Sequence, residues 1–394
     1  MAYTVLARRY RSRTFSELVG QEAIVKTLQT AIKQNRVAHA YLFTGTRGVG
    51  KTSTARLFAC ALNAVNDKGK EIPEIAEAIM RGQDTDTIEI DAASNNSVDE
   101  ARTLIANASY RPLRGRKKIY IIDEVHMLTN QAFNALLKTM EEPPEHIVFI
   151  LCTTETHKVP ATIQSRCQRF DFRSISTAVI AAHLADVIKQ EGVTADQELL
   201  HMVARLGNGS MRDALSLMDR LLAAGEKKLT PKLLEELLGL PDRTLVANLV
   251  GAIAGGEPAK ALKAADDLGK RGISPEQLLG TLADRFRDLM VIAACGPDTE
   301  LVELSDEARE EAVAQAARFD AAGLTHLIAV CDAAARNCKA SSGPRAILDA
   351  SIVRMSLSEK LADVTALLAG AVRPGAGRVG TSPALVGGPS GKKD

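Results

Sequence analysis

Short apolar runs alternate with stretches of helical periodicity over the first 172 residues. The apolar runs predict strands at Ala40–Thr44, Thr87–Ile90, Lys118–Ile122 and Ile147–Cys152. Helices are predicted between them, for example at Lys51–Asn63 and at Gln131–Met140, where apolar residues recur at helical spacing. An alternation of strands and helices favours a parallel sheet covered by helices.

The strand signal fades after Arg173. Residues 174–240 have the pattern of short helices, interrupted at Glu191-Gly192, at Gly207-Asn208-Gly209 and at Gly239. Longer helices are predicted further on, at Pro275–Ala294, Gly323–Cys338 and Pro344–Leu361. From about residue 362 the chain is rich in Ala, Gly, Pro and Ser, which is typical of a disordered tail.

This pattern predicts several domains. We expect an α/β domain at 1–173, a small helical domain at 174–240, a larger all-α domain at 241–362 and a disordered tail at 363–394. Of the 394 residues, 46% are apolar and 25% charged, which excludes wholesale disorder. Aromatic residues make up only 4%, without tryptophan, which favours a mostly helical protein.

The charge balance and the cysteine content leave this prediction of domains unchanged. The 49 basic and 48 acidic residues nearly cancel, so any contact with nucleic acid has to be local or shared with partners. The six cysteines form no C-x-x-C pair, which is typical of reduced thiols in the cytosol. The sequence has neither a signal-peptide core at its start nor an apolar run of about 18 residues, so we expect a cytoplasmic protein.

The strongest chemical signal is the string GTRGVGKT at 45–52, which matches the phosphate-loop pattern G-x-x-x-x-G-K-[ST] without a mismatch. It follows a predicted strand and opens a predicted helix, as the pattern requires. Its glycines let backbone N–H groups surround phosphate oxygens. We expect Lys51 to face the β- and γ-phosphates and the Thr52 hydroxyl to bind Mg²⁺. The predicted nucleotide-binding residues of this loop are Gly45, Thr46, Arg47, Gly48, Val49, Gly50, Lys51 and Thr52.

The second signal is an apolar strand at 119–122 that ends in two acids, Asp123 and Glu124. In a parallel sheet these carboxylates lie at the carboxyl edge, where ligands bind. We expect Asp123 to hold Mg²⁺, directly or through water, and Glu124 to polarise the attacking water. An exposed strand end is the alternative for such a pattern alone, and the phosphate loop about 70 residues earlier argues against it.

Three residues are weaker candidates on spacing alone. Thr154 follows an apolar strand, and its hydroxyl either orders the attacking water or caps the strand. Arg166 lies near the end of a short helix and is either functional or a solvated surface charge. Arg212 lies at the start of a helix and either reaches nucleotide phosphates or forms a local charge pair.

Over residues 1–362 these features resemble the gamma/tau subunits of the bacterial replicative polymerase's clamp loader, which are AAA+ ATPases. The resemblance rests on long strings in family order: Tyr3–Tyr10, FSELVGQE at 15–22, HAYLFTGTRGVGKT at 39–52, IEIDAAS at 88–94, YIIDEVHM at 120–127, FNALLKTMEEPPE at 133–145, SRC at 165–167 and GSMRDALSLMD at 209–219.

The resemblance implies an α/β P-loop AAA+ ATPase domain with a parallel sheet flanked by helices, followed by a small helical lid domain and an all-α collar domain. In the family's terms, Lys51 and Thr52 belong to Walker A, and Asp123 and Glu124 to Walker B. Thr154 matches sensor 1, Arg166 the arginine finger and Arg212 sensor 2. Ala7, Arg11 and Val19 match the segments that cradle adenine.

The activity implied by the resemblance is that of a motor, in which ATP and Mg²⁺ drive the loading of a sliding clamp onto primed DNA. The implied partners are the clamp, primer-template DNA, and the delta, delta-prime and further gamma/tau subunits of a hetero-oligomeric ring, without a membrane.

Two departures from the family pattern matter. Members usually carry a four-cysteine zinc module before the IEIDAAS strand, whereas residues 63–87 here contain no cysteine. We therefore predict no zinc and a metal-free helix at Ile72–Arg81. Ser12 replaces the usual proline after Arg11. The chain also ends soon after the third predicted domain, so we expect the short, gamma-like form or a shortened chain, without the extension of tau.

Other functions remain as alternatives. A binding-only AAA+ scaffold subunit is expected to lack the loop lysine or the Walker B glutamate, and both are present. Another AAA+ DNA-remodelling ATPase, a P-loop kinase and a nucleotidyl transferase fit less well, the last because no region is left for a polymerase domain. A basic run at 111–118 is either a DNA contact or a solvated loop. His126 and His39 are expected to support residues of the nucleotide site or to pack, rather than to bind metal.

Overall fold

The computed structural model describes residues 4–66, 70–94, 110–299, 301–302, 304 and 306–357. The chain divides into two compact units, Met1–Leu240 with Glu303–Arg309, and Pro241–Val302 with Glu310–Asp394. The tail predicted at 363–394 lies outside the described residues. The domain boundaries predicted at 173/174 and 240/241 remain predictions.

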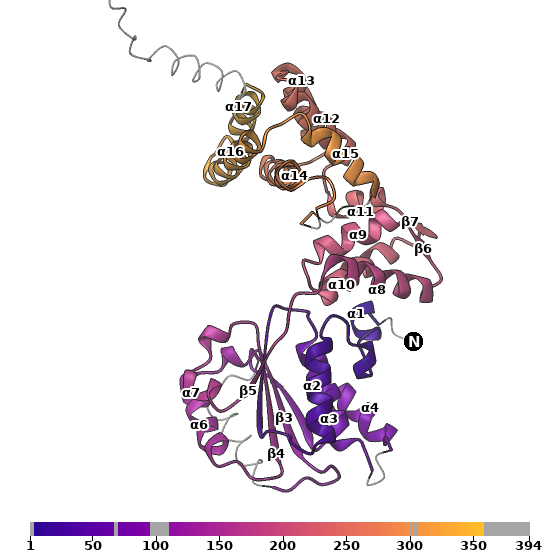
Figure 1. Cartoon of the computed structure of the whole chain (residues 1–394), viewed down its shortest axis with the longest axis vertical. Coiled ribbons are helices and arrows are strands. Elements are labelled where there is room, and N and C mark those ends of the chain that lie inside the picture. The colour runs from indigo at the N-terminus through magenta and orange to yellow at the C-terminus, as the bar shows by residue number, and fades with distance from the viewer. Residues whose placement is uncertain are drawn as a thin grey trace, which may run out of the picture. The chain divides into compact units, whose positions relative to one another are not determined.

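A five-stranded parallel sheet forms the centre of the first unit (Figure 1). Its strands are β1 (Ala40–Thr44), β2 (Thr87–Asp91), β3 (Lys118–Asp123), β4 (Ile147–Thr153) and β5 (Gln168–Asp171). They lie in the order β2-β3-β4-β1-β5. Every residue of β1 and β4 is buried, because helices cover both faces of the sheet. The predicted α/β fold is therefore confirmed.

Helices of different parts of the chain cover the two faces of the sheet (Figure 1). One face packs on α2 (Glu22–Lys33), α3 (Lys51–Asn63) and α4 (Pro73–Arg81). The other packs on α6 (Asn130–Glu141) and α7 (Ala161–Gln164). The helix predicted at Ile72–Arg81 is α4, which begins with Pro73.

The segment before β2 bears on the zinc prediction. Its only nearby cysteine, Cys60, lies within α3 and is partly buried. Within the described ranges, no group of three or more His, Cys, Asp or Glu side chains is arranged to hold a metal. The predicted absence of zinc remains a prediction from the sequence.

The register of the strands brings distant parts of the sequence to one edge of the sheet. Thr44 at the end of β1 pairs with Thr153 at the end of β4, and β4 also pairs with β3, which ends at Asp123. Because all these strands are parallel, their carboxyl ends lie at the same edge. The glycine-rich loop after β1, the acids after β3 and Thr154 after β4 therefore converge.

Four helices, which we call the lid, follow the sheet. They are α8 (Thr177–Gln190), α9 (Gln197–Leu206), α10 (Met211–Leu222) and α11 (Pro231–Leu238). The interruptions lie where the glycines predicted them. Two short strands, β6 (Thr194–Ala195) and β7 (Lys228–Leu229), also pair in this region, where no strand was predicted, because two-residue strands carry no periodicity.

The start of the chain packs with the lid. Leu6 in the short helix α1 (Leu6–Arg9) is fully buried in the hydrophobic cluster formed by α8, α9 and α10. Its backbone N–H donates to Asp219 Oδ1 of α10 at 3.1 Å. Arg9 forms an ion pair with Glu191 at 2.5 Å, and the Tyr10 hydroxyl donates to the same carboxylate. The chain then crosses from the lid to the sheet at residues 11–19.

The second unit is helical. It contains α12 (Arg243–Ala254), α13 (Pro258–Lys270), α14 (Pro275–Cys295), α16 (Ala321–Ala340) and α17 (Pro344–Ser356), and α15 spans Asp306–Ala316. Five apolar residues of α14 are at most 1% exposed, so they pack within this chain's own core: Leu278, Leu279, Leu282, Phe286 and Leu289. Helix α17 is described as far as Ser356, and the predicted end at Leu361 lies outside the described residues.

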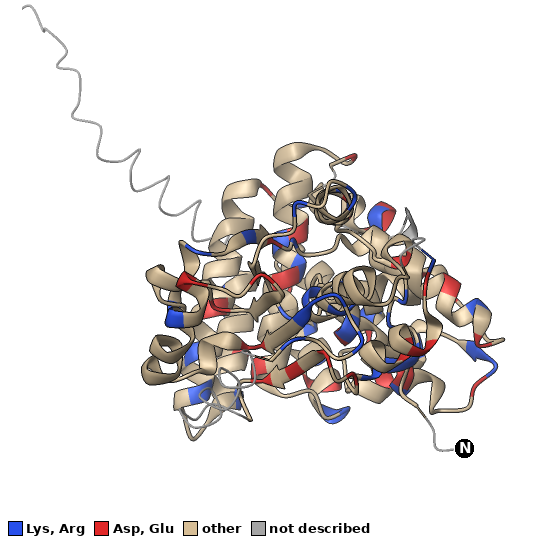
Figure 2. Cartoon of the chain, turned by 90° about the horizontal axis from the view of Figure 1, so that it is seen from below, with Lys and Arg blue, Asp and Glu red and all other residues tan. Residues whose placement is uncertain are grey.

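Charges of both signs are interspersed over the described chain (Figure 2), as the near balance in the sequence predicts. None of the described helices is long and apolar enough by itself to cross a membrane. One bent pair, Pro231–Leu238 with Arg243–Ala254, meets that test of length and composition only when the two are taken together.

The docking of α1 on the lid generates the first prediction. Leu6→Ala leaves a cavity in the lid core and is expected to destabilise the lid by about 2–5 kcal/mol. Val5→Ala is the matched control, because Val5 is 50% exposed and its truncation is expected to cost about 0.5 kcal/mol or less. Amide hydrogen exchange of the full chain measures both. Equal protection of α8–α10 in the two variants contradicts the docking.

Candidate active site

The glycine-rich loop lies between β1 and α3 and has a backbone that needs glycine. Gly45, Gly48 and Gly50 all have positive φ, at 138°, 75° and 102°. A Cβ on Gly48 would lie 1.9 Å from Ser210 Oγ, the residue that caps α10. A Cβ on Gly45 would lie 2.4 Å from the Phe172 carbonyl oxygen. These glycines therefore allow both the loop conformation and its close contact with the lid.

Lys51 opens α3 and is buried inside the loop, with 6% exposure. Its Nζ donates to the carbonyl oxygens of Gly45 and Thr46, both at 2.8 Å. Burial lowers the pKa of Lys51, and the nearby carboxylates of Glu124 and Asp123 act in the opposite direction. The ammonium group thus lies beside the positive end of α3, an arrangement that favours an anion.

Thr52 and Asp123 meet at the edge of the sheet. The Thr52 hydroxyl donates to Asp123 Oδ2 at 2.6 Å, while Oδ1 of the same carboxylate accepts the Glu124 N–H at 2.9 Å. A hydroxyl and a carboxylate oxygen this close are hard donors of the kind that Mg²⁺ prefers. The residues present therefore fit the predicted Mg²⁺ site.

Glu124 lies in an unusual backbone conformation directly after β3. Its φ and ψ are 46° and 45°, in the left-handed region that residues with a side chain seldom adopt. Its Oε2 accepts a hydrogen bond from the Thr154 hydroxyl at 3.1 Å. The strained backbone and this contact aim the carboxylate along the carboxyl edge of the sheet.

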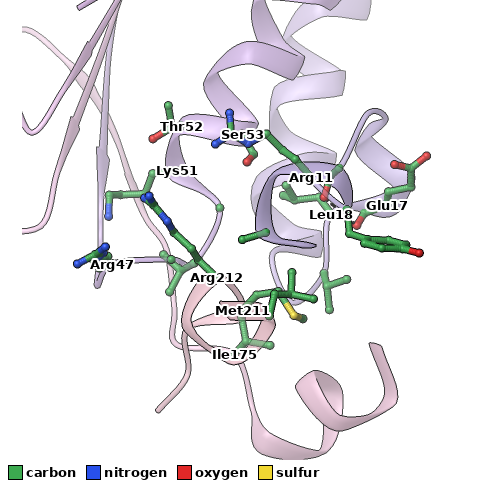
Figure 3. A pocket seen from close by; sticks show the side chains of 18 of the residues that line it. Arg11, Glu17, Leu18, Arg47, Lys51, Thr52, Ser53, Ile175, Met211 and Arg212 are labelled. Atoms are coloured by element: carbon green, nitrogen blue, oxygen red, sulfur yellow. Dashed lines mark hydrogen bonds between the residues drawn. The ribbon is translucent and has the colours of Figure 1, made fainter. Parts of the chain in front are cut away.

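A pocket surrounds these groups (Figure 3). Basic side chains line it from three parts of the chain: Arg11, Arg47, Lys51 and Arg212. Figure 3 shows Arg212 extending from the lid toward Lys51. Burial lowers the pKa of Arg11, and the neighbouring Arg56 and Arg212 add to this effect. With Asp123 and Glu124 at one side, the pocket suits a polyanion that carries a divalent cation.

The remaining lining residues are both apolar and polar, and most of them come from the start of the chain and the lid. They include the predicted Ala7 and Val19. The lining residues that the sequence analysis missed are Tyr10, Ser12, Glu17, Leu18, Ser53, Ile175, His183, Met211 and Leu215. Met211 and Leu215 lie one helical turn apart on α10, and this spacing is the only signal that indicated them.

Arg166 lies away from this pocket. It follows α7, and its guanidinium donates to the Thr162 carbonyl oxygen at 2.7 Å and to Glu141 Oε1 of α6 at 2.6 Å. The structure therefore brings Thr154 and Arg212 to the phosphate loop and the acids but does not bring Arg166 there. Gly45 and Thr46 contribute through their carbonyl groups.

A parallel sheet with this loop, this acid pair and a helical lid defines a P-loop protein of the AAA+ class. Comparison with protein families agrees with this assignment. Residues 20–176 match the family described as "DNA polymerase III, delta subunit", 179–227 match "DNA polymerase III clamp loader subunit, ATPase lid domain", and 229–369 match "DNA polymerase III subunits gamma and tau domain III".

Curated relatives are similar over most of the chain. The DNA polymerase III subunit tau/gamma of Haemophilus influenzae is 42% identical over 74% of this chain and 43% of the relative. The subunit tau of Escherichia coli is 40% identical over 77% and 48%. The subunit gamma of Buchnera aphidicola is 42% identical over 62% and 68%. The chain spans less than half the length of the first two relatives, and it belongs to the gamma/tau family of bacterial DNA polymerase III subunits.

The contact between Gly48 and the lid gives a second prediction. Gly48→Ala combines backbone strain of about 1–2 kcal/mol with a clash that displaces Ser210 and α10. We expect ATP binding to weaken about tenfold or more. Gly192→Ala is the control, because Gly192 also has positive φ (72°) but no atom within 4 Å of the added Cβ. Calorimetric titration with ATP measures both, and equal affinities contradict the role of the contact.

Proposed function

We propose that this chain is an ATP-hydrolysing motor subunit of a bacterial clamp loader, which uses ATP binding and hydrolysis to load a sliding clamp onto primed DNA. The observation that supports hydrolysis is that three kinds of group line one pocket: the loop lysine, the paired carboxylates and the lid arginine. Membership of the gamma/tau family supports the role in replication.

The substrate is ATP, and each group has a separate task. The backbone N–H groups of the loop and Lys51 bind the β- and γ-phosphates, and Lys51 offsets the charge that develops during transfer. Glu124 accepts a hydrogen bond from the attacking water and orients it toward the γ-phosphate. Thr154 holds Glu124 through its hydroxyl. Ala7, Arg11 and Val19 surround the base from the start of the chain.

Mg²⁺ fits beside Thr52 and Asp123, and when bound it neutralises phosphate charge. The Thr52–Asp123 hydrogen bond holds both oxygen groups together. Little rearrangement is then needed when the metal arrives with ATP.

The two arginines act differently in this proposal. Arg212 acts in cis, because it lines the same pocket as Lys51. Arg166 acts in trans on the nucleotide of a neighbouring subunit. Its position outside this chain's own pocket supports that assignment, and the ion pair with Glu141 orients it at the surface.

The partners that follow from this function are a sliding clamp, primer-template DNA, and other clamp-loader subunits, including delta, delta-prime and further gamma/tau copies. We further propose a cytoplasmic location, a lid domain at 174–240 and a collar domain at 241–362. A binding-only scaffold subunit is the second candidate, and the presence of both Lys51 and Glu124 argues against it.

The third prediction separates nucleotide binding from hydrolysis. Lys51→Ala is expected to weaken ATP binding and to abolish hydrolysis, because the γ-phosphate loses its nearest cation. Glu124→Gln keeps the size of the side chain and is expected to bind ATP normally while its kcat falls at least about 100-fold. ATP binding and steady-state ATPase with primed DNA and clamp measure both. Equal ATPase in wild type and Glu124→Gln rules out the role of Glu124.

The fourth prediction tests Arg166 across subunits. Arg166→Ala is expected to bind ATP normally but to fail in hydrolysis within the assembled complex, because arginine fingers contribute about 10³–10⁵ in rate. Mixing it with Lys51→Ala subunits, which retain Arg166, is expected to restore part of the activity. Arg212→Ala is the control, since a residue acting in cis on a subunit's own nucleotide is not rescued by mixing. A defect of Arg166→Ala that persists in every mixture contradicts action in trans.

A further inference from the structure

His126 lies two residues after Glu124, in the short 3₁₀ helix η2 (Val125–Met127). Its side chain is only 6% exposed, and both ring nitrogens face polar groups. Nδ1 lies 3.0 Å from Thr153 Oγ1 and 3.4 Å from Glu124 Oε2. Nε2 lies 3.3 Å from Glu155 Oε1. The imidazole therefore stands between the Glu124 carboxylate and the residues that follow β4.

We propose that His126 is a positioning residue for Glu124. The ring holds the Glu124 carboxylate against the end of β4, beside the Thr154 hydroxyl, in the orientation that ATP hydrolysis requires. This inference rests on the proposed function, because it assumes that Glu124 orients the attacking water. It assigns His126 no contact with the nucleotide.

The surroundings of His126 fix the ring from its far side. Glu155 faces Nε2, and Lys158 binds Glu155 at 2.8 Å; this hydrogen bond is the main cause that lowers the pKa of Glu155. The Glu155 N–H also donates to Thr153 Oγ1 at 3.0 Å. A carboxylate that contacts one nitrogen of a histidine orients the ring. Through the contacts of Glu155 with His126 and of His126 with Glu124, the end of β4 thus fixes the position of the catalytic carboxylate.

Glu124 needs such support for two reasons. The two partners of its Oε2 come from different elements, and its own backbone is strained. Thr154 contacts Oε2 from β4's end, and His126 contacts the same oxygen from η2. Without the ring, the Thr154 hydroxyl is the remaining side-chain contact of Glu124 Oε2 among the described residues, and the rotamers of the carboxylate are freer. A displacement of about 1 Å in a catalytic group costs on the order of 100-fold in rate.

Two substitutions test the contacts of the two ring nitrogens one at a time. Asn places a polar atom near the position of Nδ1, which faces Glu124 and Thr153. Gln places one near the position of Nε2, which faces Glu155. If His126 positions Glu124, His126→Asn retains most of the wild-type kcat, whereas His126→Gln and His126→Ala lose about 10- to 100-fold. The KM for ATP and the affinity for ATP stay within about twofold in all three variants.

The experiment measures ATPase of the full chain assembled with its partner subunits, together with ATP affinity and thermal unfolding. The matched control is His39→Ala, which removes another histidine of the same sheet at the amino-terminal end of β1, away from the acids. We expect His39→Ala to lower stability without lowering kcat. A second measurement places His126→Ala in the Glu124→Gln background, where we expect no further loss of residual turnover.

Each outcome decides the inference. It is overturned if His126→Ala has wild-type kcat, if Gln substitutes for His126 as well as Asn does, or if the loss is the same in both Glu124 backgrounds. A variant that fails to fold leaves His126→Asn and His126→Gln, whose difference in kcat still decides between positioning and mere packing. Full activity of Glu124→Gln instead contradicts the proposed function, so the two failures are distinguishable.

Discussion

The parallel register of β1, β4 and β3 is the constraint on which the site depends. It places Thr44 beside Thr153, and the end of β3 beside the same strand, so that segments about 70 and 110 residues apart share one edge. A slip of one residue would turn every side chain of a strand to the opposite face. The complete burial of β1 and β4 opposes such a slip, because both faces pack against helices. The hydrophobic core therefore fixes the distance between the phosphate loop and the acids.

The lid depends on this edge as well. Ser210 begins α10 within reach of Gly48, and Leu6 anchors the start of the chain in the lid core. Gln21 joins the two bodies, because its side-chain amide donates to the Arg173 carbonyl oxygen at 2.7 Å and its oxygen accepts the Arg173 N–H at 3.3 Å. Residues 11–19 and 172–176 are thus the two connections between lid and sheet. A ligand in the pocket contacts both bodies and opposes their separation.

The sequence predicts those parts of the site that are contiguous. The loop at 45–52 and the acids at 123–124 can each be recognised from a few adjacent residues. All four strands predicted from hydrophobicity are present. The docking of Leu6 on α10 and the contact of His126 with Glu155 are long-range packing, for which no local pattern exists. The ion pair of Arg166 with Glu141 likewise joins a helix and a loop whose proximity only the fold determines. The resemblance to a family assigned Arg166 a role, but the residues alone left it as either a functional residue or a solvated surface charge.

The hydrogen bonds of Lys51 show how the loop is prepared for a phosphate group. The ammonium group of Lys51 donates to two carbonyl oxygens of the loop, and a hydrogen bond that involves a charged group contributes about 1.5–3 kcal/mol net. These two partners of the ammonium group are neutral carbonyl oxygens, and burial lowers the pKa of Lys51 although the carboxylates of Glu124 and Asp123 act in the opposite direction. Phosphate oxygens carry negative charge, so their hydrogen bonds to the ammonium group add a charge–charge attraction that neutral carbonyl oxygens do not offer. The loop therefore already holds the Lys51 ammonium group in place. Exchange of its two carbonyl partners for phosphate oxygens then favours binding of the anion.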